Sequence, residues 1–257
     1  MTDEGYTIVI PARYASSRFP GKALHPLVGR PMILHTLDRA RESRAARTVV
    51  ATDDERIAEI CRAAGADVEM TSAAHPSGTD RIAEVAARRR WPETTRIVGL
   101  QGDEPATPPA RLDALAANLG AHPEADMATF CAPIGSEAHY RDPMRVKVVR
   151  DARDMALYFS RAPIPWRRDA RDDGSFPEAF LHVGLYAYRA GYLARYGALE
   201  PAAAEGEEQL EQLRVLHHGG RIHVGTLEAG EAHGVDVPGD VAAAERALAA
   251  LARERRS

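Results

Sequence analysis

The chain has 257 residues, and its 33 Lys and Arg residues against 37 Asp and Glu residues give a formal net charge of -4. This balance excludes a strongly basic protein that coats nucleic acid, so we expect no nucleic-acid partner. A composition that is 45% hydrophobic and 27% charged is typical of a globular protein and excludes disordered, collagenous and disulfide-rich classes.

The first residues and the two cysteines bear on the cellular compartment. No signal peptide precedes Thr7, and no apolar stretch reaches the ~20 residues that a bilayer span needs. Cys61 falls in a helical pattern and Cys131 in an apolar run, which favours two buried thiols over a disulfide or a metal site. We therefore expect a cytoplasmic protein that does not insert into a membrane.

The first half of the chain alternates short apolar runs with amphipathic ones. The expected strands are residues 6–11, 48–52, 67–70, 96–100 and 127–131. The expected helices are residues 31–41, 54–64, 80–90 and 109–119. Pro31 and Pro109 begin two of these helices, where the missing N–H of a proline costs nothing. Repeated strand and helix units predict an α/β fold class with a mostly parallel central sheet flanked by helices.

Beyond Pro133 this regular alternation ends. Strand-like runs separated by Pro- and Arg-rich connections follow at residues 146–150, 156–159 and 181–188. A helix, a returning strand and a closing Ala-rich helix are expected at residues 210–217, 221–227 and 238–253. The chain has no long Gly-, Ser- or Pro-rich linker. We therefore predict a single domain over residues 1–257 with a smaller inserted lobe over residues 134–200.

In an open parallel sheet, ligands bind at the carboxyl ends of the strands, so the residues after each strand are informative. The loop after the first strand carries Arg13, Ser16, Arg18 and Lys22. Three cations, the two hydroxyls of Ser16 and Ser17 and the loop amides suit a polyphosphate, although a solvated basic loop has the same composition. Only two of the 33 basic residues are lysines, Lys22 and Lys147, which favours a need for a compact ammonium there, with two ordinary surface lysines as the alternative.

Two common phosphate motifs are absent from this loop. The first strand is not followed by GxGxxG, which argues against a dinucleotide-binding dehydrogenase. Residues 20–23 do not complete a GxxxxGK[ST] loop. A nucleotide would therefore bind through a different cradle.

Carboxylates follow two other predicted strands. Asp103 and Glu104 follow shortly after the run at 96–100, where they suit a hard divalent cation or an acidic turn that caps the next helix. Asp236 precedes the closing helix, a place where Asp is more often a cap than a ligand. Taken together, a cationic loop and two carboxylate-bearing strand ends favour metal-assisted attack at a nucleotide phosphate.

The loop at residues 11–22 resembles the nucleotide loop of the 3-deoxy-D-manno-octulosonate (Kdo) cytidylyltransferases, or CMP-Kdo synthetases. Further segments resemble that family in the same order along nearly the whole chain. They are residues 51–53, 77–81, 101–105, 158–166, 181–189, 210–214 and 234–236.

The resemblance implies a Rossmann-like, nucleotide-diphospho-sugar transferase-like fold and a nucleotidyltransferase activity. CMP would pass from CTP to the anomeric 2-hydroxyl of Kdo, with Mg²⁺ as the cofactor and release of pyrophosphate. The product, CMP-Kdo, would activate Kdo for lipopolysaccharide biosynthesis. The resemblance also implies a homodimer, and a lobe over residues 134–200 that binds the sugar and takes part in dimerisation.

The resemblance also implies roles for single residues. The CTP phosphates would meet Arg13, Ser16, Arg18 and Lys22. The cytosine and ribose would meet Ser77, Gly78, Asp80, Arg81 and Gln101. Asp103 and Asp236 would bind Mg²⁺ and, with Lys22 and Arg13, form the catalytic group. Kdo would meet Arg161, His182, Tyr186, Glu211 and Gln212. Without the resemblance, Arg161 reads as a surface ion pair and His182 as an ordinary strand histidine.

Two alternative functions remain. A cytidylyltransferase for 8-amino-Kdo or a sialic acid is the nearer alternative, although sialic-acid enzymes are expected to carry Arg-Gly-Gly-Ser where this chain has Arg-Tyr-Ala-Ser at 13–16. A non-catalytic nucleotide or sugar sensor would not need Lys22, Asp103 and Asp236 together.

The chain departs from the family pattern in two places. Acidic residues and Gly206 weaken the helix expected around 210, and residues 237–239 lack a hydroxyl cap.

Overall fold

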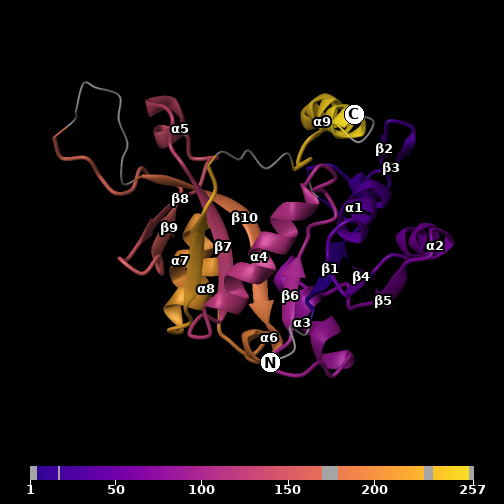
Figure 1. The fold of residues 1–257 in the computed structure, drawn as a ribbon, viewed down its shortest axis with the longest axis horizontal. Coiled ribbons are helices and arrows are strands. Elements are labelled where there is room, and N and C mark those ends of the chain that lie inside the picture. The colour runs from indigo at the N-terminus through magenta and orange to yellow at the C-terminus, as the bar shows by residue number, and fades with distance from the viewer. Residues whose placement is uncertain (1–4, 17, 170–178, 229–233, 255–257) are drawn as a thin grey trace.

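The computed structural model describes residues 5–16, 18–169, 179–228 and 234–254 (Figure 1). Its main sheet has the strand order β11-β7-β10-β6-β1-β4-β5. These strands are β1 (Thr7–Ala12), β4 (Arg47–Thr52), β5 (Asp67–Met70), β6 (Arg96–Gly99), β7 (Met127–Pro133), β10 (Phe180–Arg189) and β11 (Ile222–Thr226).

Most neighbouring strands of this sheet are parallel. β1 pairs in parallel with β4 and β6, β4 with β5, and β11 with β7. β10 is the exception, because it lies between β6 and β7 and is antiparallel to both. The predicted α/β fold class with a mostly parallel sheet is confirmed.

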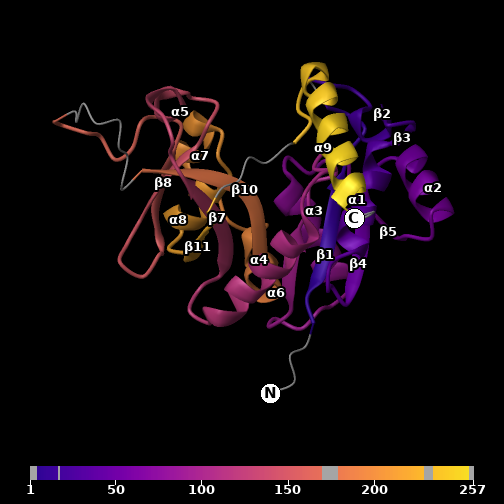
Figure 2. The same ribbon diagram turned by 45° about the horizontal axis from the view of Figure 1, so that its top comes forward.

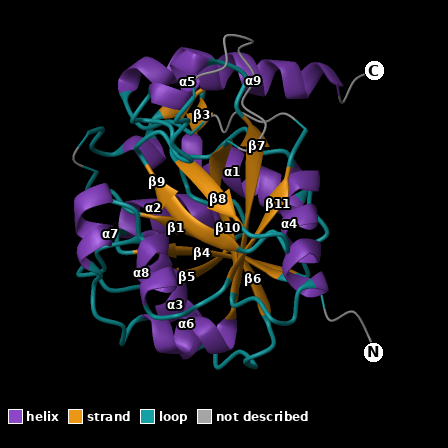
Figure 3. Cartoon of the chain, turned by 90° about the vertical axis from the view of Figure 1, so that its left-hand side faces the viewer, coloured by secondary structure: helices purple, strands orange, loops and turns teal. Residues whose placement is uncertain are grey.

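Helices cover both faces of the sheet, so its central strands are apolar on both sides (Figure 3). Ile8 and Ile10 of β1 belong to a core that includes Leu37 and Leu115 from two helices on one face. Val9, between them, belongs to a second core on the other face, because successive side chains of a strand alternate between the faces. A strand buried in this way reads as a continuous apolar run.

The four helices expected in the first half of the chain are present. They are α1 (Met32–Arg41), α2 (Glu55–Ala63), α3 (Gly78–Arg88) and α4 (Pro109–Ala121). Asp54 caps α2 by accepting the N–H of Arg56, and the Ser77 hydroxyl caps α3 by accepting the N–H of Asp80. α4 begins at Pro109, as expected.

Three helices were not expected from the sequence. They are α5 (Glu137–Arg141), α6 (Ala190–Tyr196) and α7 (Ala203–Glu208). α7 contains Gly206 and forms because the Glu205 carboxylate accepts the N–H of Ala202 at 3.1 Å. Gln209 then takes a left-handed conformation with φ 53°, so α8 (Gln212–His217) begins two residues later than expected.

The C-terminal segment supplies its own helix cap. The short 3-10 helix η2 (Pro238–Asp240) leads into α9 (Val241–Glu254). The Asp240 carboxylate accepts the N–H groups of Asp236 and Val237, which replaces the hydroxyl cap missing from residues 237–239. α9 packs against the hairpin of β2 (Pro26–Leu27) and β3 (Arg30–Pro31), as Figure 2 shows.

The region of the expected lobe contains α5, β8 (Lys147–Arg150) and β9 (Ala156–Ser160), which lie together at one side of the molecule (Figure 1). β10, also expected within the lobe, runs through the main sheet and pairs with β8 at its beginning. Residues 170–178 of the expected lobe lie outside the described residues. The lobe as a separate unit remains a prediction.

Lys147 and the two cysteines are all buried. The Lys147 ammonium donates to the backbone carbonyls of Asp142, Arg145 and Arg161, so this lysine holds the lobe's loops and is not on the surface. The thiols are free, as expected. No helix in the described ranges is long and apolar enough to cross a membrane.

Candidate active site

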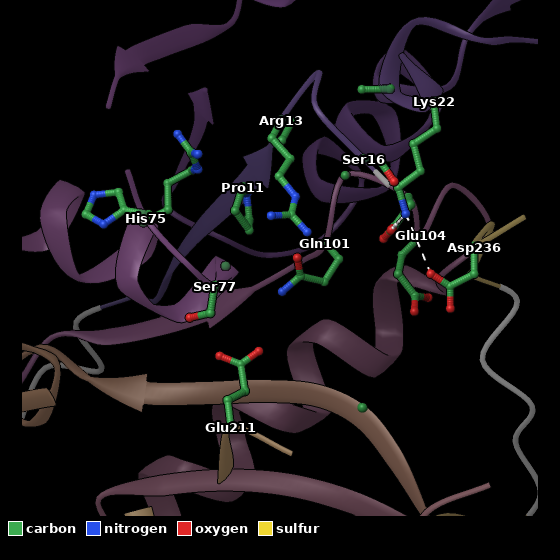
Figure 4. A pocket seen from close by; sticks show the side chains of 18 of the residues that line it. Pro11, Arg13, Ser16, Lys22, His75, Ser77, Gln101, Glu104, Glu211 and Asp236 are labelled. Atoms are coloured by element: carbon green, nitrogen blue, oxygen red, sulfur yellow. Dashed lines mark hydrogen bonds and ion pairs between the residues drawn. The ribbon is translucent and has the colours of Figure 1, made fainter. Parts of the chain in front are cut away.

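A polar cavity of about 470 Å³ lies at the carboxyl ends of the parallel strands (Figure 4). Its walls come from the loops after β1 and β6, the beginning of α3, β10, the beginning of α8 and the segment before η2. Twelve of the residues to which the resemblance assigns a role line it. They are Arg13, Ser16, Arg18, Lys22, Ser77, Gly78, Arg81, Gln101, Asp103, Tyr186, Glu211 and Asp236.

The loop after β1 is held in shape by Tyr14. Its backbone carbonyl accepts the N–H groups of Ser16 at 3.0 Å and Gly21 at 2.9 Å. Gly21 has φ +71°, and a Cβ there would lie 3.1 Å from the Tyr14 ring, so this position requires glycine. The Arg56 guanidinium covers the ring, 3.4 Å from its centroid. The loop therefore places Lys22, the first residue of the 3-10 helix η1 (Lys22–Leu24), at the cavity wall.

Lys22 joins the two carboxylates that follow separate strands. Its ammonium donates to the Asp103 carboxylate and lies 3.6 Å from Asp236 Oδ1 and 3.3 Å from the Val235 carbonyl oxygen. Arg18 Nη2 lies 2.8 Å from the same Asp236 oxygen. Asp103 and Asp236, distant in the sequence, therefore meet at one cation, as Figure 4 shows for Lys22 and Asp236.

A third carboxyl group, Glu104, lines the same part of the cavity. Burial, with the charge of Asp103 next in importance, raises the pKa of Glu104 to about 7. The Thr107 hydroxyl donates to it at 3.0 Å. The sequence showed only that Glu104 follows Asp103, and its burial depends on packing from elsewhere, such as Gly234, whose added Cβ would lie 3.2 Å from Glu104 Oε1.

The beginning of α3 forms the opposite wall. Gly78 has no space for a side chain, because a Cβ would lie 2.8 Å from Nε2 of Gln101. Arg81 is buried and pairs with Asp53 at 3.1 Å, so it is held against the sheet. Asp80 does not line the cavity and instead accepts a hydrogen bond from the Ser77 hydroxyl at 2.7 Å.

Two of the residues expected on the sugar side, Tyr186 and Glu211, line the cavity. Tyr186 lies on β10, and Glu211 directly precedes α8. In Figure 4 the Glu211 carboxylate points across the cavity toward Ser77. Burial raises the pKa of Glu211, and the hydroxyls of Thr79 and Ser77 partly oppose this rise.

Three other residues expected on the sugar side are not among the lining residues. Arg161 donates from Nε to the Glu208 carbonyl oxygen at 2.7 Å and from Nη1 to that of Pro143 at 3.0 Å. His182 lies behind Tyr186, 3.0 Å from the Thr129 hydroxyl, and burial lowers its pKa to about 3. Gln212 is buried, and its Nε2 has no hydrogen-bond partner among the described residues.

Comparisons with known proteins agree with this arrangement. A family model described as cytidylyltransferase matches residues 7–222. The 3-deoxy-manno-octulosonate cytidylyltransferase of Alkalilimnicola ehrlichii is 52% identical over 252 residues, covering 95% of this chain and 96% of that protein. The enzyme of the same name from Nitrosococcus oceani is 48% identical, covering 92% of this chain and 93% of that protein.

A solved structure supports the same relationship. The structure of CMP:2-keto-3-deoxy-manno-octonic acid synthetase complexed with CTP is 40% identical, with a TM-score of 0.87, over 96% of this chain and 99% of that chain. Identity at this level over nearly the full length of both chains extends well beyond a shared fold. The chain therefore belongs to the cytidylyltransferase family, among its 3-deoxy-manno-octulosonate cytidylyltransferases.

Proposed function

We propose that the protein transfers CMP from CTP to the anomeric 2-hydroxyl of Kdo, giving CMP-Kdo and pyrophosphate and activating Kdo for lipopolysaccharide biosynthesis. The observation that carries this proposal is the single cavity where cations of the β1 loop meet Asp103 and Asp236. Such a site receives a triphosphate and a cation together. The relatives' names supply the identity of the nucleotide and the sugar.

The nucleotide would lie between the β1 loop and the beginning of α3. Arg13, Arg18 and Lys22 supply charge-assisted hydrogen bonds to phosphate oxygens, and Ser16 adds a hydroxyl. The cytosine and ribose would meet Ser77, Gly78, Arg81 and Gln101, with Asp80 supporting Ser77 from behind. The wall at Gly78 is tight, because its backbone already lies against the Gln101 amide.

Asp103 and Asp236 fit a magnesium ion by the chemistry of their donors. Carboxylate oxygens are ligands that Mg²⁺ prefers, usually one or two from the protein with phosphate oxygens completing the set. The part of the chain that the structure describes holds no group of three or more His, Cys, Asp or Glu residues arranged for a metal ion. A site of two protein carboxylates shared with a triphosphate agrees with both facts.

The chain's own residues then prepare an in-line displacement. Lys22, Arg13 and Arg18 offset phosphate charge, which opens the α-phosphorus to the Kdo hydroxyl. The new bond joins that oxygen to the α-phosphorus, the hydroxyl proton passes to water, and the bond to the pyrophosphate oxygen breaks. Bound Mg²⁺ would polarise the α-phosphate and lower the pKa of the hydroxyl, so that no dedicated side-chain base is required.

Kdo would occupy the side of the cavity between Tyr186 and Glu211. The guanidinium of Arg161 contacts two neutral carbonyl oxygens, so its charge is not matched by an anion in those contacts. A sugar carboxylate would supply that anion. His182 and Gln212 lie directly behind this side and complete the proposed sugar group.

We also propose a homodimer formed through the lobe around β8 and β9. Met144, Leu157 and Trp166 of this region are exposed to 72%, 61% and 69%, which favours a protein partner. Light scattering of the purified protein tests this, with Leu157→Glu expected to give monomers and a monomeric wild type contradicting the proposal.

Two buried thiols agree with the proposed cytoplasmic location, which cell fractionation would check.

Pyrophosphate release with CTP tests the proposed reaction. The acceptors are Kdo, 8-amino-Kdo and a sialic acid, each with and without Mg²⁺. We expect the highest kcat/KM with Kdo. We expect no pyrophosphate release without Mg²⁺. Equal or faster release with another keto-acid sugar would reassign the acceptor, and pyrophosphate release that needs no acceptor would refute sugar transfer.

A further inference from the structure

Arg214 is a buried arginine of α8 that does not line the cavity. Its guanidinium pairs with both oxygens of Glu205, from Nε at 2.9 Å and from Nη2 at 2.6 Å. Nη1 lies 3.9 Å from Oδ1 of Asp80, and the group stands over the Tyr196 ring at 4.9 Å. One side chain therefore connects α3, α6, α7 and α8.

The contacts of Arg214 lead to both walls of the cavity. On one side, Asp80 exchanges hydrogen bonds with Ser77, whose hydroxyl donates to Asp80 Oδ2 at 2.7 Å and accepts the N–H of Asp80 at 3.2 Å. On the other side, the backbone N–H of Arg214 donates to the Glu211 carbonyl oxygen at 3.2 Å. Ser77 and Glu211 face each other across the cavity (Figure 4). The nucleotide wall and the sugar wall are thus joined behind the cavity.

The side chains in this connection have little freedom to adjust. The exposed fractions of the Arg214, Asp80 and Glu205 side chains are 10%, 11% and 13%. A bidentate guanidinium–carboxylate pair fixes direction as well as distance, which a single ammonium does not. Loss of the guanidinium would leave two mostly buried carboxylates near Glu211, which is itself half-buried.

We propose that Arg214 is a positioning residue that couples the nucleotide wall to the sugar wall. This inference rests on the proposed function. Nucleotide bound at Ser77 is then linked through Asp80 and Arg214 to the place of Glu211, so that CTP improves the binding of Kdo. Arg214 itself touches neither substrate.

The test compares Arg214→Lys and Arg214→Gln with a matched control, Arg195→Gln. Arg195 also combines an ion pair, with Asp126 at 3.2 Å, and a ring contact, with Tyr192 at 5.6 Å, but it does not line the cavity. In the Arg214 variants we expect the KM for Kdo to rise roughly 10- to 100-fold, the effect of a small misplacement of a binding group. The Kd for CTP measured without sugar and the kcat at saturation should stay near wild type. Arg195→Gln should leave all three values unchanged.

A second readout does not require turnover. Amide hydrogen exchange of residues 212–217 should slow when CTP binds to the wild type and to Arg195→Gln, but not when it binds to Arg214→Gln. The same slowing in the Arg214→Gln protein, or none in the wild type, would overturn the coupling. An equal rise in the CTP and Kdo constants with a lowered Tm would show a merely structural role and would also overturn it. A wild type that binds CTP but releases no pyrophosphate with Kdo would instead refute the proposed function, and the exchange data would still decide the coupling.

Discussion

Replacement of Lys22 by methionine separates the stability of the site from its chemistry. The Lys22 side chain is 14% exposed, and its ammonium contacts Asp103, Asp236 and the Val235 carbonyl. Methionine has a similar length and fills the same space but carries no charge. The substitution leaves the two carboxylates without this shared partner.

The expected loss of stability is modest. A hydrogen bond to a charged group contributes roughly 1.5 to 3 kcal/mol, and the partial exposure of Asp103 and Asp236 reduces this to about 1 to 2 kcal/mol. For a protein of this size that lowers Tm by roughly 2 to 8 °C. The expected loss of catalysis is larger, because a preorganised donor aimed at developing phosphate charge contributes a factor on the order of 10² to 10³ in kcat.

Urea unfolding and pyrophosphate-release kinetics measure the two losses on the same preparation. Lys22→Arg is the matched variant, which keeps the charge but replaces a compact ammonium by a planar group. We expect it to be more active than Lys22→Met and to have a lower kcat than the wild type. A folded Lys22→Met protein with a wild-type kcat/KM for CTP would refute the placement of this lysine on the phosphates.

Three further outcomes are expected. Asp103→Ala should lower kcat on the order of 10²-fold with the fold intact, measured over a range of Mg²⁺ concentrations, and near wild-type turnover at ordinary Mg²⁺ would contradict the metal assignment. Arg161→Ala should raise the KM for Kdo roughly 10- to 150-fold and leave CTP affinity without sugar unchanged, whereas a weakened CTP affinity would place Arg161 on the nucleotide. Burial lowers the pKa of His182 from 6.5 to about 3, so between pH 6.5 and pH 3 the unfolded state binds a proton that the folded state does not. The free energy of unfolding therefore falls as the pH drops below 6.5, by at most ~1.4 kcal/mol per pH unit. Urea unfolding at pH 7 and pH 5 should show a smaller fall for His182→Gln than for the wild type, and equal falls would contradict the burial of a neutral imidazole.

Local patterns were sufficient where one stretch of sequence decides the structure. The run at β1 is mostly apolar because both of its faces are covered and all six of its residues are buried, and Ser77 caps α3 from within the same turn. The rule that ligands lie beyond the carboxyl ends of parallel strands directed attention to the loops of Lys22 and Asp103, and both residues line the cavity.

Features that depend on distant partners were not predictable in the same way. Gly206 weakens α7 locally, but Glu205 gains a cap at Ala202 and a bidentate pair with Arg214. Glu104 has a raised pKa only because the folded chain buries it near Asp103. Periodicity within a segment contains no information about such contacts.

The antiparallel direction of β10 explains why the residues proposed for the sugar side were indicated only by the family resemblance. Tyr186 pairs with Gly99, at the end of β6, and the later residues of β10 run back along β6 to Arg189. The residues that extend past the carboxyl end of β6 are therefore those that precede Tyr186. They include Gly184, which lines the cavity, and His182, whose ring contacts that of Tyr186. In a parallel strand, the residues near the ligand come after the strand in the sequence. In β10, which is antiparallel, they lie in the first part of the strand. One reversed strand thus brings a segment about 80 residues later in the chain over the edge where the residues proposed for the nucleotide lie, so the residues proposed for the two substrates come together at one cavity because that strand runs against its neighbours.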